Sequence, residues 1–373
     1  MDTRPGRFVL GSARLSGLPV ALTLALASAC ASPAAQGVAT APAGFEQMRK
    51  VDVHSHIYED VPAVNAMLRR INLRVINVSV PATDGHLAFM HRFNAGQVKR
   101  HPDLFSWAST FDLAARNEPD YGPRTAKALD ETFAQGAVMV KIWKEVGIEL
   151  KRPDGAFLLP DDAVLDPVYA HLASRKKPLL AHLAEPREAW LPLDPKGVHY
   201  SYYSRNPKWH LYGRSEFPSH ERLMEARDRI LAKHPALVVI GAHIGSLEHD
   251  VDEVAARLDT YPNFNVEVSA RTRDLVRQPS SKVRAFFVKY QDRILYGVDR
   301  SWMPHRTPDT KPTDAQREKF AADLEAQYRR DWAYYAGTGR ITYNDDTVEA
   351  LGLAPDVLEK FYWKNAERLI GVK

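Results

Sequence analysis

Residues 50–56 read KVDVHSH, a short β-type run that ends in two histidines. Seven further β-type runs follow it, at 73–80 (LRVINVSV), 104–110 (LFSWAST), 136–143 (GAVMVKIW), 177–183 (KPLLAHL), 236–243 (ALVVIGAH), 264–269 (FNVEVS) and 293–298 (RILYGV). The residues between these runs show helical periodicity or helix start signals. Strands that alternate with helices predict an α/β fold with a parallel sheet.

Eight such units fit a (β/α)8 (TIM) barrel, regular or distorted. A doubly wound open sheet is the alternative architecture. No GxGxxG or GxxxxGK[ST] motif follows any of the runs, which disfavours a nucleotide-binding sheet. Helices are expected at 219–233, 248–259 and 282–290, and Ser219 is the expected N-cap residue of the first.

Two connections are longer than a barrel requires, and both follow the C-terminal end of a strand. Residues 300–355 follow the eighth run and include a predicted helix at 313–333. Residues 184–218 follow the fifth run and are rich in aromatic residues: Trp190, Tyr200, Tyr202, Tyr203, Trp209 and Tyr212. Since barrel active sites lie at this end, the aromatic loop is expected to form a wall or lid for a substrate, or else to pack on itself.

Polar side chains end several of the apolar runs. His54 and His56 lie two residues apart, so on a strand they project to one face. Neutral imidazoles that converge at a barrel mouth are good ligands for zinc, manganese or iron. Four other runs end in, or close to, a residue able to ligate or transfer protons: Lys141, His182, His243 and Asp299. The pattern predicts a metal site at the C-terminal ends of the strands.

With these residues in place, the chain resembles the amidohydrolase superfamily. It is similar in particular to the amidohydrolase 2 branch, which contains aminocarboxymuconate semialdehyde decarboxylase, γ-resorcylate decarboxylase and 2-pyrone-4,6-dicarboxylate lactonase. The resemblance covers about residues 50–371 and includes the closing segment VLEKFYWKNAERLIG. Homodimers are common in this branch, so a dimer is one expectation.

The resemblance implies that four side chains bind one or two divalent cations, with zinc preferred and manganese or iron as alternatives: His54, His56, His182 and Asp299. Asp299 would also act as a base. His243 would act on the substrate beside the metal, or orient another ligand. Lys141 would bridge two metals if carbamylated; otherwise it would bind substrate, support a ligand or form a salt bridge.

Three further residues follow strand ends and are expected to contact substrate: Trp143, Glu185 and Arg271. The guanidinium of Arg271 could grip a carboxylate, although a surface salt bridge is an equal alternative. The expected activity is metal-dependent hydrolysis of an ester, lactone or amide in a small substrate, which could be aromatic or bear a carboxylate. The alternatives are non-oxidative decarboxylation of an aromatic or unsaturated acid, and ligand binding by a non-catalytic lipoprotein.

The N-terminal residues resemble an export signal. Three arginines precede an apolar segment at 18–26, which is shorter than the roughly 20 residues of a membrane span. The sequence LASAC at 26–30 resembles a lipoprotein processing site. Residues 1–29 are therefore expected to be a signal peptide, 30–45 a tether and 46–373 the barrel. A lipid on Cys30 would anchor the protein in the periplasm or at the cell surface, whereas cleavage after Ala29 would secrete it.

The composition excludes several kinds of site and partner. The 373 residues include 14 His and one Cys, so an internal disulfide or a cysteine-rich metal site is excluded. The net charge is +4 without a long Lys/Arg run, and no nucleic-acid partner is expected. A small molecule remains the expected partner.

Overall fold

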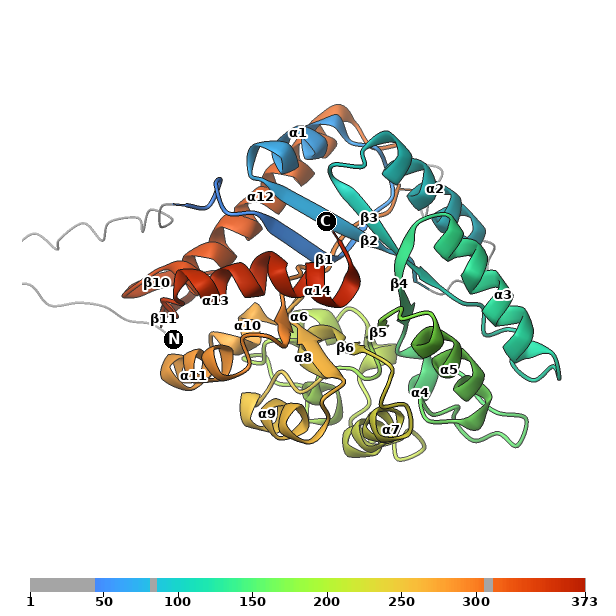
Figure 1. The fold of residues 1–373 in the computed structure, drawn as a ribbon. Helices are drawn as coiled ribbons and strands as arrows, with labels where there is room; N and C mark the ends of the chain where they lie inside the picture. The colour runs from blue at the N-terminus through green and yellow to red at the C-terminus, as the bar shows by residue number, and fades with distance from the viewer. Residues whose placement is uncertain (1–43, 81–85, 305–310, 373) are drawn as a thin grey trace, which may run out of the picture. The chain divides into compact units, whose positions relative to one another are not determined.

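Parallel strands in chain order, separated by helices, organise the computed structural model, which describes residues 44–80, 86–304 and 311–372 (Figure 1). The expected signal peptide, Cys30 and nearly all of the tether lie outside these residues. In the described part of the chain no helix is both long and apolar enough to cross a bilayer.

All eight predicted strands form, and each pairs with the next. They are β1 (Lys50–Ile57), β2 (Leu73–Val78), β3 (Phe105–Thr110), β4 (Ala137–Ile142), β5 (Leu179–Ala181), β6 (Val239–Gly241), β7 (Phe264–Glu267) and β8 (Ile294–Leu295). The strands of the second half are shorter than the apolar runs that predict them, because the chain turns away from the sheet within each run.

The eighth strand closes the sheet into a barrel. β8 pairs with β7, and the chain then continues as β9 (Arg300–Trp302), which pairs in parallel with β1. Two backbone hydrogen bonds join β1 to the segment that follows β8: Val53 N donates to Tyr296 O (3.0 Å), and Asp299 N donates to His54 O (2.7 Å). The first and last strands are thus hydrogen-bonded to each other, which excludes the doubly wound open sheet.

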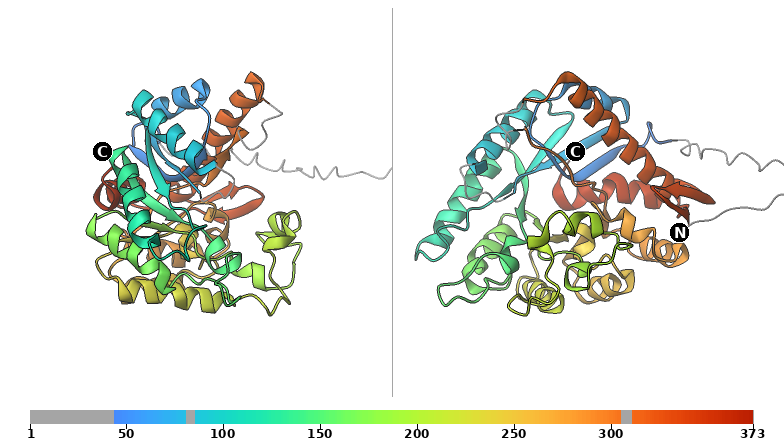
Figure 2. Two further views of the ribbon diagram at one scale, coloured as in Figure 1. Left: turned by 90° about the vertical axis from the view of Figure 1, so that its right-hand side faces the viewer. Right: turned by 180° about the vertical axis from the view of Figure 1, so that it is seen from behind.

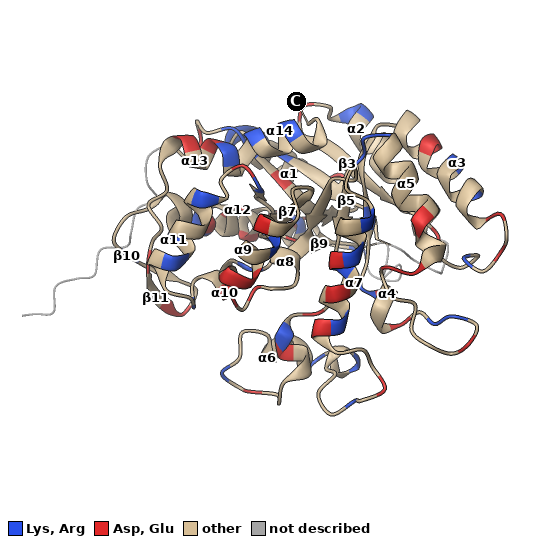
Figure 3. Ribbon diagram, turned by 60° about the horizontal axis from the view of Figure 1, so that its bottom comes forward, with Lys and Arg blue, Asp and Glu red and all other residues tan. Residues whose placement is uncertain are grey.

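The main helices surround the barrel (Figures 1 and 2). They are α1 (Pro62–Arg70), α2 (His86–Arg100), α3 (Tyr121–Ala134), α5 (Asp166–Ser174), α7 (His220–Lys233), α9 (Val251–Thr260), α11 (Ser280–Lys289) and α12 (Asp314–Ala336). The predicted cap is present, since Ser219 Oγ accepts from Arg222 N. Acidic and basic residues alternate along the ribbon of α7 (Figure 3).

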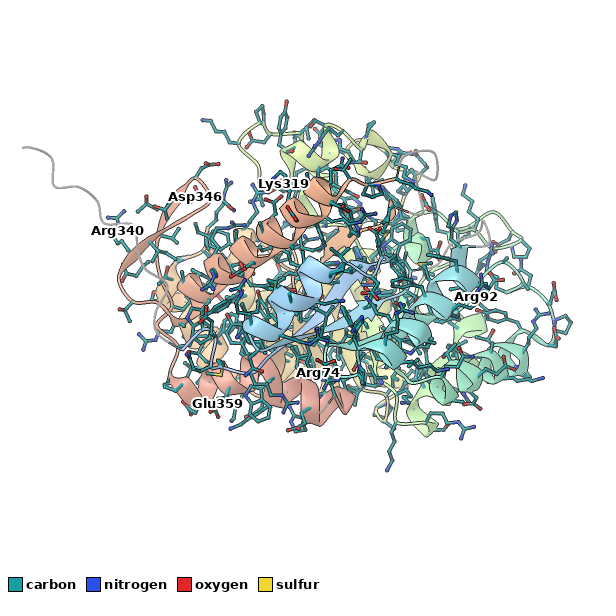
Figure 4. The ribbon with its side chains drawn as sticks, turned by 90° about the horizontal axis from the view of Figure 1, so that it is seen from above. Arg74, Arg92, Lys319, Arg340, Asp346 and Glu359 are labelled. Carbon is teal, nitrogen blue, oxygen red and sulfur yellow. The ribbon has the colours of Figure 1, made fainter. Side chains whose placement is uncertain are left out.

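The connections that follow the strands carry additional short elements. The loops at the strand ends contain α4 (Glu145–Ile148), α6 (Tyr200–Tyr203), α8 (Ala242–Gly245) and α10 (Thr272–Leu275). The connection after the eighth strand holds α12, which begins with a Thr313–Gln316 capping box and packs beside α1. The hairpin of β10 (Arg340–Tyr343) and β11 (Asp346–Glu349) follows it; Figure 4 shows the hairpin, marked by Arg340 and Asp346, beyond α12, marked by Lys319.

The C-terminal segment seals one end of the barrel. It consists of α13 (Pro355–Glu359), a π-helical turn at Lys360–Lys364 and α14 (Asn365–Ile370). Ala366, Ile370 and Val372 join the apolar cluster that fills the barrel interior, which includes Val51, Val53, Ile76, Val78, Ala108, Met139, Leu180, Ile240, Ala242 and Leu295. A site for a ligand is therefore left at the opposite end, at the carboxyl ends of the strands.

A register shift in β1 sets the direction of the two histidines. Val51 and Val53 point into the barrel, so strict alternation would turn His54 and His56 outward. The pairing of β1 with β2 shifts between Asp52 and Ser55, and both imidazoles line the cavity at the barrel mouth. The irregularity thus moves the histidine pair to the inner face.

The buried Asp52 carboxylate fixes this irregularity. Oδ1 accepts from His54 N (3.0 Å) and Val298 N (3.2 Å). Oδ2 accepts from Ser55 Oγ (2.6 Å) and from Tyr328 Oη (2.9 Å) on α12. One side chain therefore joins β1, the eighth strand and α12.

We predict that Asp52→Ala destabilises the barrel, whereas Asp52→Asn is tolerated. Alanine leaves two buried N–H groups without an acceptor, at a cost of about 3 kcal/mol or more. Burial raises the pKa of Asp52 to about 7, so the environment accepts a neutral side chain. The asparagine oxygen can accept both N–H groups while its amide donates to the two hydroxyls. Urea unfolding checks this; equal loss in the two variants contradicts it.

Candidate metal centre

The carboxyl ends of the strands surround a cavity of about 350 Å³. Every site residue predicted from the sequence lines it: His54, His56, Lys141, Trp143, His182, Glu185, His243, Arg271 and Asp299. The cavity wall also contains Tyr202, from the aromatic loop expected to form such a wall, and Lys144 and His199, which the sequence analysis did not select. The fold thus brings together residues that are up to 245 positions apart in the chain.

Three imidazoles point an unprotonated nitrogen toward the centre of the cavity. The Nδ1 atom of His56 lies 2.7 Å from Val78 O, and that of His243 lies 2.8 Å from Ser269 O. Since a carbonyl only accepts, each Nδ1 must carry the proton. His54 Nδ1 likewise donates to the Glu267 carboxylate (2.9 Å). In each neutral ring, Nε2 therefore carries the lone pair, and that of His54 faces the Lys141 amine at 3.0 Å.

Asp299 lies among these nitrogens. Its Oδ1 atom is 3.1 Å from His56 Nε2 and 3.7 Å from His54 Nε2, and Oδ2 is 3.8 Å from His243 Nε2. Ligands bonded to one cation at about 2.1 Å are themselves separated by about 3.0–3.4 Å. The group of His54, His56 and Asp299 therefore has nearly the spacing that a shared metal ion requires.

His182 supplies a fourth donor. Its Nε2 atom is buried and has no hydrogen-bond partner among the described residues. Its ring lies 4.3 Å from that of His243, measured between centroids. A buried ring nitrogen without a partner, beside the His243 imidazole and in the wall of the same cavity as His54, His56 and Asp299, fits a metal ligand, so the donor set suits a divalent cation.

The protonation states match this reading. Burial lowers the pKa of His54, His182 and His243 below the ordinary value of 6.5, which keeps the rings neutral. Burial alone would raise the pKa of the Asp299 carboxyl, but the effect of positive charge and N–H donation from the His54, His56 and His243 rings is larger and places that pKa well below 3.8. A cation held among neutral rings would supply the same positive charge. The centre therefore combines neutral nitrogen donors with one ionised oxygen donor.

The backbone at the centre is strained. His243 has φ = 60° and Asp299 has φ = 55°, in the left-handed region that residues with a Cβ rarely adopt. His243 lies two residues after β6 and Asp299 directly before β9, and both side chains line the cavity at the barrel mouth. Strain of this kind persists where surrounding structure enforces it, and it is typical of functional sites.

Glu267, at the end of β7, is the main residue that the sequence analysis missed. Its Oε1 atom accepts from His54 Nδ1 and from the backbone N–H of His243 (both 2.9 Å), and the side chain is fully buried. Burial opposes ionisation, but His54 and His243 offset it and lower the pKa of Glu267 to about 2. The three could also hold a cation themselves. The signal was available: a charged residue interrupts the apolar run FNVEVS.

Lys141 lies at the centre of the cavity. Its Nζ atom is 3.0 Å from His54 Nε2, and it has no ion pair within the described ranges. Burial is the main cause that lowers its pKa to about 8. The amine lies against an expected metal ligand. This position suits either a carbamate that bridges two metals or an ammonium that binds a substrate carboxylate.

A second cation and its aromatic neighbours form the outer wall. Lys144 Nζ is ion-paired with Glu185, donates to Tyr202 Oη (3.1 Å) and lies 4.0 Å from the ring centroid of Trp209. Trp143 packs edge-on against Trp209. The 184–218 loop therefore forms part of the cavity wall and also packs on itself. Tyr202 lines the cavity, whereas Trp209 is buried.

Arg271 completes the cavity wall. Its Nε atom is buried without a hydrogen-bond partner in the described chain, and the nearest carboxylate, Glu248, is 4.0 Å away. The guanidinium therefore lines the cavity with donor capacity that no tight salt bridge consumes.

Comparison with known proteins places the chain in a family. No protein with a curated description matches it. Among solved structures, similar ones include 2,6-dihydroxybenzoate decarboxylase from Rhizobium (16% identity, 87% of this chain and 99% of that one, TM-score 0.48). Another is 5-carboxyvanillate decarboxylase LigW from Sphingomonas paucimobilis (12% identity, 87% of this chain and 100% of that one, TM-score 0.47). A third is the TIM-barrel protein Bb4693 from Bordetella bronchiseptica (15% identity, 87% of this chain and 99% of that one, TM-score 0.48). The family model described as "Amidohydrolase" matches residues 51–372, so the chain belongs to the amidohydrolase family of metal-dependent enzymes.

Proposed function

We propose that this enzyme hydrolyses an ester, lactone or amide bond in a small substrate that bears a carboxylate and a flat or aromatic body. One observation carries the choice of hydrolysis: the Asp299 carboxylate is ionised and the His243 ring is neutral, so both are in their proton-accepting forms. Hydrolysis begins with removal of a proton from water, which such groups can accept.

The metal would be held by His54, His56, His182 and Asp299, with zinc as the first choice and manganese or iron as alternatives. A divalent cation bound there supplies Lewis-acid polarisation of a substrate oxygen and lowers the pKa of water. One ion accounts for these four donors. A second would require Lys141 to be carbamylated, or Glu267 to exchange its hydrogen bonds for a metal bond.

The chain's own residues then divide the work. Asp299 accepts the proton of the attacking water, because its carboxylate is ionised. His243 Nε2 can hydrogen-bond the developing charge or pass a proton to the leaving group. Arg271 and Lys141 bind the substrate carboxylate, and the wall of Trp143 and Tyr202 packs on its flat body.

Decarboxylation remains the second candidate, and Lys141 is the observation that favours it. This amine is buried at the centre and lies 3.0 Å from His54 Nε2. As an ammonium it could supply the proton that a carbon atom needs when CO2 leaves, while Arg271 holds the carboxylate. The non-catalytic lipoprotein is a third proposal, and export with a lipid on Cys30 stays a prediction from the sequence.

We predict that metal and activity are lost together. His56→Ala and Asp299→Ala should each reduce the bound divalent metal at least tenfold, because each removes a donor atom from the same centre. His210→Ala is the matched control, since His210 lies outside the cavity. Elemental analysis of the purified proteins measures the metal. Wild-type protein without any metal would refute both enzymatic proposals.

Metal binding should also persist at mildly acidic pH. Protons compete with metals for imidazole, and burial lowers the pKa values of His54 and His182 below 6.5. Both rings are thus less protonated at mildly acidic pH than an unperturbed imidazole is. Dialysis over pH 5–8 followed by elemental analysis tests this. Release with a midpoint at or above pH 6.5 would contradict it.

A substrate panel separates the two reactions. Metal-loaded enzyme is incubated with aryl esters, lactones, amides and hydroxybenzoic acids, and acid release and CO2 release are recorded in parallel. Hydrolysis predicts acid release that falls at least a hundredfold in Asp299→Asn. CO2 release from an aromatic acid without acid release from any ester, lactone or amide would favour the decarboxylase.

A further inference from the structure

A second cavity of about 520 Å³ lies beside the catalytic one, and three arginines line it. Arg273 comes from α10, Arg300 from β9 and Arg330 from α12; the β10–β11 hairpin closes a further side. We call it the arginine chamber. It shares Ala270 with the catalytic cavity and includes Arg300, the residue after Asp299.

Among the described residues the three guanidinium groups lack carboxylate and hydrogen-bond partners, although Arg330 Cζ lies 5.9 Å from the ring centroid of Tyr343. Neither a salt bridge nor a hydrogen bond is made by any of them within residues 44–80, 86–304 and 311–372. Most other arginines in that part of the chain are ion-paired, as Arg317 is with Glu59 and Arg329 with Glu325 and Glu46. Arg330 Nε is in addition buried without an acceptor, which is costly for a charged donor.

The acidic groups of the chamber do not neutralise the arginines. Asp331 Oδ1 accepts from Tyr343 Oη (2.6 Å) and Oδ2 from Tyr296 Oη (2.9 Å). Asp345 is exposed at the hairpin turn and forms no ion pair among the described residues. Three cations that share a cavity with two carboxylates, neither of them ion-paired to an arginine, leave a positive field within it.

We propose that the arginine chamber binds a doubly charged oxyanion, such as a phosphate or sulfate group. Planar guanidinium groups donate paired hydrogen bonds to tetrahedral oxyanions and compensate their charge. Gln327 and Asn344 add amide donors at the wall. The oxyanion is either free in solution or the distal group of a substrate whose reacting end occupies the catalytic cavity. The binding step itself is independent of the reaction catalysed.

Calorimetric titration with inorganic phosphate at constant ionic strength tests the proposal on the metal-loaded protein. We expect one site per chain, with affinity reduced at least tenfold in Arg330→Gln and in Arg300→Gln. Arg284→Gln is the matched control, because Arg284 is exposed on α11 and outside the chamber; its affinity should equal that of the wild type. Circular dichroism and metal content verify that each variant is folded and loaded.

A second probe, 4-carboxyphenyl phosphate, distinguishes the source of the oxyanion. If the chamber holds the distal group of a substrate, this two-headed probe should bind at least tenfold more tightly than phosphate and lose that gain in Arg271→Gln. If the chamber takes a free oxyanion, the two probes should bind alike. No phosphate binding, or binding abolished by Arg271→Gln but unchanged in Arg300→Gln and Arg330→Gln, would overturn the proposal.

Discussion

The Asp52 carboxylate is the constraint on which the rest of the site depends. It accepts hydrogen bonds from β1 itself, from the eighth strand and from α12. These bonds hold the register shift that turns His54 and His56 into the barrel, and they hold the end of the eighth strand from which Asp299 projects. One buried side chain therefore links the closure of the barrel to the placement of the histidine pair, and the cost of burying a carboxylate is offset by four donors.

A second layer of hydrogen bonds orients the histidines at the barrel mouth. Val78 O, Ser269 O and the Glu267 carboxylate each accept from an Nδ1–H group, which fixes both the tautomer and the ring orientation. Glu267 also binds the backbone of His243, where the chain is strained. The inner side chains are thus held before any ligand enters, and such preorganisation lowers the cost of binding and of charge development.

Much of the fold could be predicted, because the signals are local. Each apolar run forms a strand, and the caps at Ser219 and Thr313 lie where the helices begin. The candidate site could be predicted because parallel strands bring their carboxyl ends to one edge. Glu267 was missed because a single acidic residue within a strand forms no recognisable motif. Lys144 was missed because Trp143, directly before it, had already been chosen as the site residue at the end of the fourth strand. No sequence pattern indicated that Arg273, Arg300 and Arg330 line one cavity, because the three residues lie on separate elements.

By itself, the sequence determined the order of strands and helices, the family and the residue types available at the barrel mouth, since these depend on periodicity and on side-chain chemistry along the chain. The tertiary structure decided which way those side chains point. Strict alternation from Val53 would send His54 outward, and only pairing with β2 and the contact of Asp52 with the eighth strand and α12 reverse this. Proton positions and pKa shifts were also decided there, because they arise from burial and from neighbours more than 100 residues away, which no local pattern records.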